Sequence, residues 1–409
     1  MPKYDFDEMT DRRGTFSSKW NVAENELPLW VADMDFKAAP EIISAMGKRL
    51  EHGIFGYTDI PEEWKAAYIN WNKNRHGFEI APDWLMFCTG IVPAISSLVR
   101  KLTTPNENVL LLTPVYNIFY NSIVNNGCRV AECPLVYDKD AKDSVGSYNI
   151  DFNLLEEMLA NPQTSLMILC NPHNPVGRIW SRDELAKIGH LCKKHGVTVI
   201  SDEIHCDLVA PGKEYVPFAS VDDDCRNISI SCIAPTKTFN IAGLQTAAIY
   251  AANPFLRHKA WRAINTDEVA EPNVFAVSAA IAAFTEGGEW LDELRDYLWQ
   301  NRSAAEKFIQ TEIPGIRPVP AEATYLMWID CSSIMDKKAL KKLQKCNCPD
   351  IAAYIRRETG LYLSAGEHYG NGGRHFMRLN LACPQKRLME AMTRLKRGIL
   401  SLLNWKWDD

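Results

Sequence analysis

From residue 84 onward the chain alternates short apolar runs with longer segments whose apolar residues recur every three or four positions. Short runs of this kind predict strands, and the longer segments predict amphipathic helices. The runs cover residues 84–88, 108–112, 166–170, 197–200, 227–233 and 244–251. Continuously apolar strands are typical of sheets buried on both faces, so the pattern predicts an α/β fold with a mostly parallel sheet between layers of helices.

The pattern differs on either side of this region. Before it, residues 1–35 show little periodicity, and helices are predicted over 40–50 and 61–76, each with proline near its first turn and glycine beyond its end. After about residue 285 we expect a charged helix (289–310), a strand (324–329), a helix (349–359), a glycine-rich loop (366–373), a strand (376–381) and a terminal helix. We therefore predict a large domain over 51–285 and a smaller, discontinuous α+β domain made of 1–50 and 286–409.

Composition narrows the class of protein. With 409 residues, 46% of them hydrophobic and 23% charged, the chain is typical of a soluble globular protein of two domains. A net charge of −6 disfavours nucleic-acid or anionic-membrane partners, and no apolar run approaches membrane-spanning length. The first residues lack a signal-peptide pattern, and the twelve cysteines form no even framework, which favours reduced thiols in a cytoplasmic protein. Cys346-Asn-Cys348 lacks a second cysteine pair, so no metal site is expected.

A glycine or a residue with a polar side chain stands at or just after the end of five predicted strands. These residues are Gly90, Tyr116, Asn174, Asp202 and Lys237. In open α/β sheets, ligands bind beyond the carboxyl ends of the strands. The sequence therefore predicts a ligand site at this edge of the sheet.

Lys237 and Asp202 are the most informative of the five. Lys237 follows an apolar strand that stops at Pro235, and a desolvated lysine there has the shifted pKa that a Schiff-base lysine needs. An ordinary loop lysine is the alternative. Asp202 ends a core strand without a basic neighbour in sequence, and a buried carboxylate is costly unless it meets a cation. A protonated pyridine nitrogen is such a cation.

Several motifs resemble one enzyme family. The segments Asn171-Pro-x-Asn174-Pro-x-Gly177, Asp202-Glu-Ile-His205, Thr236-Lys237 and Arg378-x-Asn380-x-Ala382 resemble the fold-type-I pyridoxal 5′-phosphate (PLP) enzymes of aminotransferase class I/II. More narrowly, the segments 30–36, 56–58, 114–116, 202–208 and 237–240 look like the cystathionine β-lyase or C–S lyase branch, the cystalysin type. The resemblance covers nearly the whole chain. It implies PLP as the cofactor and the PLP-dependent transferase fold, with a seven-stranded sheet.

The resemblance also implies roles in cofactor binding. Lys237 would hold PLP covalently and then remove the substrate's Cα proton, and Asp202 would pair with the pyridine nitrogen. The remaining cofactor contacts would come from Asn174 to the phenolic oxygen, Tyr116 stacked on the ring, the Gly90 and Ile91 amides and Thr236 to the phosphate, and Tyr57, which would reach the partner's phosphate across a homodimer interface. Tyr57 and Tyr116 are also the catalytic candidates beside Lys237. Alternatively, both tyrosines are core aromatics and Asn174 is a turn former.

For the substrate, the resemblance implies that Arg378 binds the α-carboxylate bidentately. The loop containing Trp30, Ala32 and Asp33 would lie over the substrate. Arg374 is the alternative carboxylate binder, although its place in the glycine-rich loop favours a solvated role.

Three positions depart from the family pattern. Ala234 stands where many relatives have a phosphate-binding serine, and Gln245 stands where aminotransferases often have an arginine. His205 replaces the tyrosine that usually donates to the phenolic oxygen. Phosphate affinity must then rest on the backbone, Thr236 or Tyr57.

The implied reaction is the α,β-elimination of cystathionine or a related cysteine S-conjugate to a thiol, pyruvate and ammonia. An aminotransferase, or a PLP-loaded regulatory protein with incidental lyase activity, would use the same residues and stays open as an alternative. We expect a cytoplasmic homodimer that acts on a small sulfur-containing amino acid.

Overall fold

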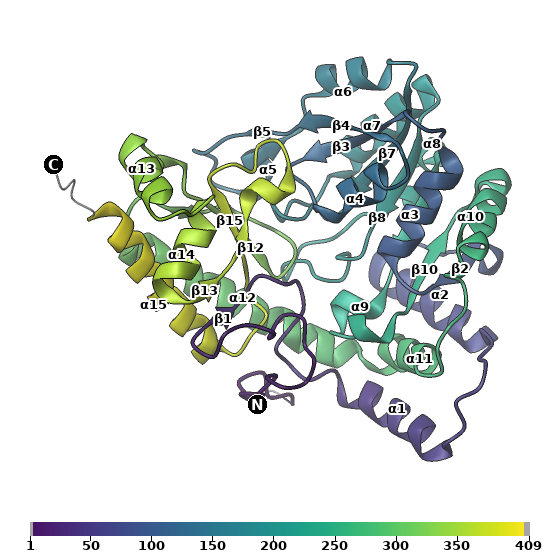
Figure 1. Cartoon of the computed structure of the whole chain (residues 1–409). Coiled ribbons are helices and arrows are strands. Elements are labelled where there is room, and N and C mark those ends of the chain that lie inside the picture. The colour runs from purple at the N-terminus through teal and green to yellow at the C-terminus, as the bar shows by residue number, and fades with distance from the viewer. Residues whose placement is uncertain (1–2, 405–409) are drawn as a thin grey trace.

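A seven-stranded sheet forms the centre of the molecule in the computed structural model, which describes residues 3–404 (Figure 1). Its strands lie in the order β2 (Leu85–Cys88), β10 (Ala247–Tyr250), β9 (Ser229–Ile233), β8 (Thr198–Asp202), β7 (Thr164–Cys170), β3 (Asn108–Thr113) and β4 (Arg129–Pro134). Only β10 runs antiparallel to its two neighbours; the other adjacent pairs are parallel. The predicted mostly parallel α/β sheet is confirmed.

Both faces of this sheet are covered by helices. Alternate residues of one strand enter different cores: Val109 and Leu111 pack in the cluster with α3 (Ile91–Leu102) and α10 (Pro254–Thr266), near α4 (Ile118–Val124). Leu110 and Leu112 pack in the cluster with α6 (Phe152–Leu159), α7 (Arg182–His195) and α8 (Asp223–Ile228). Because neither face meets water, the strands are continuously apolar, which is why they were recognisable in the sequence.

Helix ends follow the local signals closely. The helices α1 (Pro40–His52) and α2 (Glu62–His76) end at Gly53 and Gly77, whose φ angles of 74° and 64° are left-handed. Ser181 and Glu184 form the capping box that starts α7. The strand starts predicted at 84, 166, 197, 227, 244 and 324 differ from the observed ones by one to three residues. Asp222 caps α8, which takes in residue 227 so that β9 begins at Ser229, and a 3₁₀ turn (η3, Ala242–Leu244) precedes β10.

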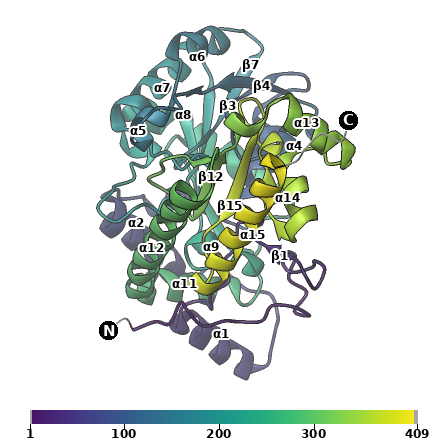
Figure 2. The same ribbon diagram turned by 90° about the vertical axis from the view of Figure 1, so that its left-hand side faces the viewer.

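The C-terminal part contains a four-stranded antiparallel sheet. Its strands lie in the order β11 (Arg317–Pro318), β12 (Leu326–Asp330), β15 (Phe376–Asn380) and β14 (Ser364–Ala365). The helices α12 (Gly288–Glu312) and α15 (Gln385–Leu403) lie side by side (Figure 2), and α13 (Lys337–Lys345) and α14 (Ile351–Thr359) complete this part. The β12–β15 register places Arg378 opposite Trp328, in the middle of a buried strand.

The N-terminal segment contacts both parts of the molecule. The short strand β1 (Leu27–Pro28) pairs in parallel with β13 (Leu361–Tyr362), whereas α1 packs on α11 (Ala276–Glu286). The domain boundaries predicted at residues 50 and 285 therefore stay predictions. The other short elements are β5 (Val136–Tyr137) paired with β6 (Tyr148–Asn149), α5 (Ser144–Ser147) and α9 (Pro235–Thr238).

Two further observations bear on the environment of the chain. Within residues 3–404, no helix combines the length and apolar character that crossing a membrane requires. All twelve cysteines have free thiols, and all but Cys346 and Cys348 are buried.

Candidate active site

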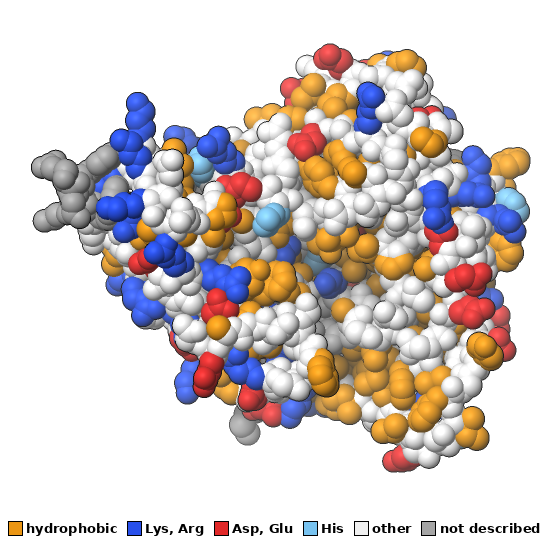
Figure 3. All heavy atoms as spheres, viewed as in Figure 1, with side chains coloured by type: hydrophobic (Ala, Val, Ile, Leu, Met, Phe, Trp, Pro, Cys, Tyr) orange, Lys and Arg blue, Asp and Glu red, His pale blue; other side chains and the backbone are white. Residues whose placement is uncertain are grey.

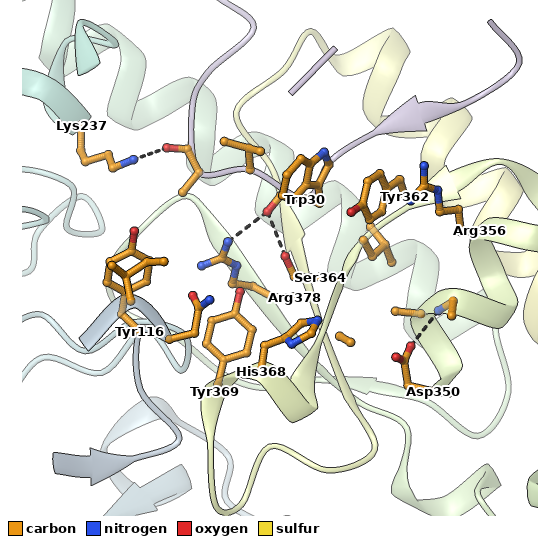
Figure 4. A pocket seen from close by; sticks show the side chains of 18 residues that line it. Trp30, Tyr116, Lys237, Asp350, Arg356, Tyr362, Ser364, His368, Tyr369 and Arg378 are labelled. Atoms are coloured by element: carbon orange, nitrogen blue, oxygen red, sulfur yellow. Dashed lines mark hydrogen bonds between the residues drawn. The ribbon is translucent and has the colours of Figure 1, made fainter. Parts of the chain in front are cut away.

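A cavity of about 500 Å³ lies where the carboxyl ends of the central strands meet the four-stranded sheet. Figure 3 shows a hollow with basic side chains in this face of the molecule, and Figure 4 shows the lining residues. Five residues predicted from the sequence line it, namely Trp30, Ala32, Tyr116, Lys237 and Arg378. The first and last of them, Trp30 and Arg378, are 348 positions apart in the chain, so only the fold brings these residues together.

Lys237 enters the cavity from the short helix α9, directly after β9 ends. Its Nζ donates a hydrogen bond to the Ala32 carbonyl oxygen at 2.5 Å (Figure 4). Burial lowers the pKa of Lys237 to about 8, an effect that Arg378 reinforces and that Asp33 and Asp202 oppose. A neutral amine, the nucleophilic and basic form, is therefore accessible near neutral pH.

Asp202 is the last residue of β8 and only 4% exposed. Its Oδ1 accepts a hydrogen bond from the Ile204 amide at 3.2 Å, and no described cation forms an ion pair with it. Burial raises the pKa of Asp202 to about 7; Glu203 adds to the rise and Lys237 opposes it. The chain thus keeps a buried carboxylate without a cation, which fits a site for a positively charged ring nitrogen.

Arg378 and Asn174 are in direct contact. Arg378 donates from Nη1 to Asn174 Oδ1 at 3.1 Å and from Nη2 to the Trp30 carbonyl oxygen at 3.0 Å. Its Nε is buried without a partner among the described residues, so the guanidinium retains donors for a carboxylate. Because Arg378 uses only the side-chain oxygen of Asn174, the side-chain nitrogen can donate to a ligand. Arg374, the alternative carboxylate binder, is exposed in the glycine-rich loop.

Of the groups predicted to face the cofactor's ring and phosphate, Tyr116 lines the cavity. Burial raises the pKa of Tyr116 to about 12, so its phenol stays protonated. Gly90 precedes α3, and no side chain caps the first turn of this helix. The backbone amides of Gly90 and Ile91 lie at this helix N-terminus, which favours an anion such as a phosphate, although the Gly90 amide also contacts the Cys88 thiol. Thr236 lies buried within α9, beside Lys237.

Three predicted residues occupy different surroundings. His205 is buried with Nδ1 unpartnered within the described chain, and burial, with Lys237 and Arg378, lowers its pKa to about 3, so the ring is neutral. Asp33 does not line the cavity; its carboxylate pairs with Arg12 at 2.8 Å and with Lys19 at 3.5 Å. Tyr57 is fully exposed in the loop between α1 and α2.

No role was predicted from the sequence for three other residues of the site, although Asn240 and Asn380 belong to motifs quoted above. The segment 31–36 is held over the cavity by the side-chain amides of Asn240 and Asn380 and by the Tyr325 hydroxyl. Asn380 donates to the carbonyl oxygens of Val31 and Asp33 at 2.7 and 2.6 Å, and Tyr325 donates to that of Ala32 at 2.9 Å. Asn240 exchanges hydrogen bonds with Met34. These contacts join positions that are remote in sequence, so periodicity could not reveal them.

Asp207 helps to fix the short helix α9, which carries Lys237. Its carboxylate accepts hydrogen bonds from Trp71 Nε1 and Thr238 Oγ1 and contacts His76 Nε2, each at 2.9 Å. Because Thr238 follows Lys237 directly, these bonds tie α9 to the end of α2. His76, Cys206 and Asp207 also bring possible metal-ligand atoms within 4.8 Å of one another, but the oxygens of Asp207 are already used by these donors.

Comparison with known proteins agrees with this geometry. The family model described as aminotransferase class I and II matches residues 19–395, and the chain belongs to this family. The family resemblance predicted from the motifs is therefore confirmed.

Within the family, the chain is similar to proteins named as lyases. It is 42% identical over 402 residues to the cystathionine beta-lyase PatB of Bacillus subtilis, covering 96% of this chain and 99% of that protein. The crystal structure of cystalysin from Treponema denticola, which contains PLP, matches with a TM-score of 0.89 and 34% identity, over 98% of this chain and 99% of that one. A PLP-bound C–S lyase from Staphylococcus hominis matches with a TM-score of 0.87 and 31% identity, over 97% and 99%.

Proposed function

We propose that this protein is a PLP-dependent C–S lyase. It eliminates the thiol from Cβ of cystathionine or a related cysteine S-conjugate, and one water is consumed as the remainder becomes pyruvate and ammonia. The observation that carries the proposal is that Lys237 and Arg378 line one cavity, with Asn174 hydrogen-bonded to Arg378 and with Asp202 close enough to Lys237 to affect its pKa, in a chain that matches a named cystathionine β-lyase over 96% of its length.

The residues that bind PLP are those that already fit it. Bound PLP supplies an electron sink that stabilises negative charge at the substrate's Cα. Lys237 would hold the cofactor covalently, and Asp202 would keep its ring nitrogen protonated because the buried carboxylate needs a cation. Asn174 would donate its amide N–H to the phenolic oxygen, and Tyr116 would cover the ring. The amides of Gly90 and Ile91, with Thr236, would bind the phosphate.

The substrate's α-carboxylate binds to the unused donors of Arg378. This contact would direct the Cα–H bond toward Lys237, whose Nζ can accept the proton as a neutral amine once the substrate's amino group has displaced it from the cofactor. The segment containing Trp30 and Ala32 covers the cavity, and Asp33 anchors that segment through Arg12 rather than by touching the substrate. His205 stays neutral beside the cofactor and leaves the ring's charge to Asp202.

We further propose a homodimer in which Tyr57 reaches the partner's phosphate. Exposed hydrophobic residues accompany Tyr57 along α1 and the loop after it, namely Ile43, Leu50, Ile54 and Phe55. Figure 3 shows hydrophobic side chains gathered over the region of α1 and α11. A surface of this kind is typical of an interface. The free thiols support a cytoplasmic location.

A substrate panel tests the reaction. Purified protein with PLP is given cystathionine and simple cysteine thioethers, and thiol, pyruvate and oxo-acid-dependent amino transfer are measured together, with Lys237→Ala as the control. We expect equal amounts of thiol and pyruvate from the wild type and neither from the variant. Amino transfer without thiol release would identify an aminotransferase instead. Lyase turnover too slow for metabolism, with capture of a protein partner, would favour the regulatory alternative.

A further inference from the structure

The cavity extends beyond the residues that the chemistry at Cα and Cβ requires. Its outer end is lined by Asp350, Arg356, Tyr362 and His368 (Figure 4). Asp350 caps α14, Arg356 lies within that helix, and Tyr362 belongs to β13. Acidic and basic groups thus stand together in the same cavity as Lys237, at the end away from it.

Arg356 is held in a fixed orientation. Its guanidinium lies 3.7 Å over the Tyr362 ring, and Nε and Nη2 donate to Glu26 at 2.6 and 2.9 Å. Nη1 takes no part in the bonds to Glu26, and the side chain is 37% exposed, so this nitrogen can reach a ligand. Because the stacking and the ion pair restrict the side chain before a ligand arrives, binding an anion at Nη1 costs little conformational entropy.

Trp30 connects the two ends of the cavity. Its carbonyl oxygen accepts from Arg378, and its ring stacks on Tyr362 at 4.8 Å and 15°. Figure 4 shows Tyr362 between Trp30 and Arg356. The two arginines are therefore connected through Trp30 and Tyr362. Both faces of Tyr362 are also covered, so the outer end offers no free face of this ring on which an aromatic ligand could stack.

Asp350 supplies the opposite charge. One carboxylate oxygen accepts from the Ala353 amide at 2.7 Å, and the second oxygen is left for a ligand. Since Glu26 already balances Arg356, a ligand that brings both an ammonium and a carboxylate matches the outer end better than an alkyl group does.

We infer that the outer end binds the far α-amino acid group of a thioether that joins two amino acids. Arg356 Nη1 binds its carboxylate and Asp350 binds its ammonium, while Arg378 and Lys237 act on the cysteine half. This inference rests on the proposed lyase function and names its substrate class: thioethers whose leaving thiol carries an amino acid group, in preference to alkyl conjugates.

Three synthetic thioethers separate the two contacts. S-(2-carboxyethyl)cysteine carries only the far carboxylate, S-(2-aminoethyl)cysteine carries only the far ammonium, and S-ethylcysteine carries neither. Their kcat/KM values are compared in wild type, Arg356→Gln and Asp350→Asn; asparagine caps a helix as well as aspartate does, so α14 keeps its cap. Arg357→Gln, on the exposed face of α14, is the matched control.

We expect Arg356→Gln to lower kcat/KM for the carboxyethyl substrate about tenfold more than for S-ethylcysteine, mainly through KM. Asp350→Asn should lower the value for the aminoethyl substrate about fivefold more than for S-ethylcysteine. Cystathionine should respond to both variants, and Arg357→Gln should change none of the four.

Equal effects of a variant on all three synthetic substrates would assign it a structural role and overturn the subsite. Unchanged kinetics would overturn it too. If the wild type released thiol from S-ethylcysteine, either result would leave the lyase function standing. If it released thiol from none of the substrates, the proposed function itself would fail.

Discussion

Arg378 Nη1 lies 3.1 Å from Asn174 Oδ1, across 204 positions of the chain. Asn174 lies in the loop after β7 and Arg378 stands in the middle of β15, so the hydrogen bond joins the two sheets. It couples the group proposed to bind the substrate's carboxylate to the group proposed to bind the cofactor's phenolic oxygen. Positioning of the substrate and of the cofactor is thereby set by the same pair.

Arg378→Gln should lower kcat/KM roughly 100-fold, because a buried charge-assisted pair with the α-carboxylate is lost. Arg374→Gln, which changes the exposed arginine four positions earlier, should stay within about twofold of the wild type. Steady-state thiol release measures both. If Arg374→Gln lowered kcat/KM more than Arg378→Gln did, Arg374 would be the residue that binds the α-carboxylate.

Asp202→Asn should change the free energy of unfolding in opposite directions with and without PLP. Burial raises the pKa of Asp202 to about 7, so between about pH 4 and 7 the folded chain binds a proton that the unfolded chain has released. The contribution of this group to the free energy of unfolding therefore falls as pH rises through that window. At pH 8, PLP-free Asp202→Asn should be more stable than the wild type by about 1–3 kcal/mol, and at pH 4 about equal to it.

With PLP the order should reverse, because only the carboxylate balances the ring nitrogen's charge. Thermal melts with and without PLP at both pH values measure these differences. A lower melting temperature of the PLP-free variant at pH 8 would contradict the assignment of Asp202 as an uncompensated buried charge.

Mixing Tyr57→Ala with Lys237→Ala should restore activity that neither variant has alone. If Tyr57 acts across the interface, each mixed dimer holds one site with both native residues, and random mixing yields about a quarter of wild-type activity. The measurement is thiol release after the chains are mixed, unfolded and refolded. If mixed dimers form but thiol release does not return, Tyr57 acts in its own chain's site or outside any site.

Asp207→Asn should lower the free energy of unfolding by about 2–4 kcal/mol, since a buried acceptor with several donors loses its charge. Burial alone would raise the pKa of Asp207, but His76, Trp71 and Thr238 hold it below the usual value. Its stabilising contribution is therefore present above about pH 4 and is lost as pH falls further. Thr238→Val removes one donor only and should cost about 1 kcal/mol by chemical denaturation.

The sequence by itself determined the class of the large sheet, and its motifs supplied the candidate residues of the site. Strands buried on both faces are continuously apolar, and helix caps such as Ser181 and Gly53 act within a few positions. Both can therefore be recognised from neighbouring residues in the sequence. The motif residues Asp202 and Lys237 stood out because each follows a strand directly. Strand starts at 227 and 244 were misplaced, because the cap at Asp222 and the turn before β10 compete with apolar character.

Only the tertiary structure decided what those residues touch. The pairing of Arg378 with Asn174, the support of Lys237 by Asp207 through Thr238, and the stack of Trp30, Tyr362 and Arg356 all join segments that are distant in the chain. Asp33 turned from a predicted substrate contact into the partner of Arg12 for the same reason. Hydrophobic pattern and helix capping are short-range, whereas hydrogen bonds between side chains of different elements depend on how the sheets pack.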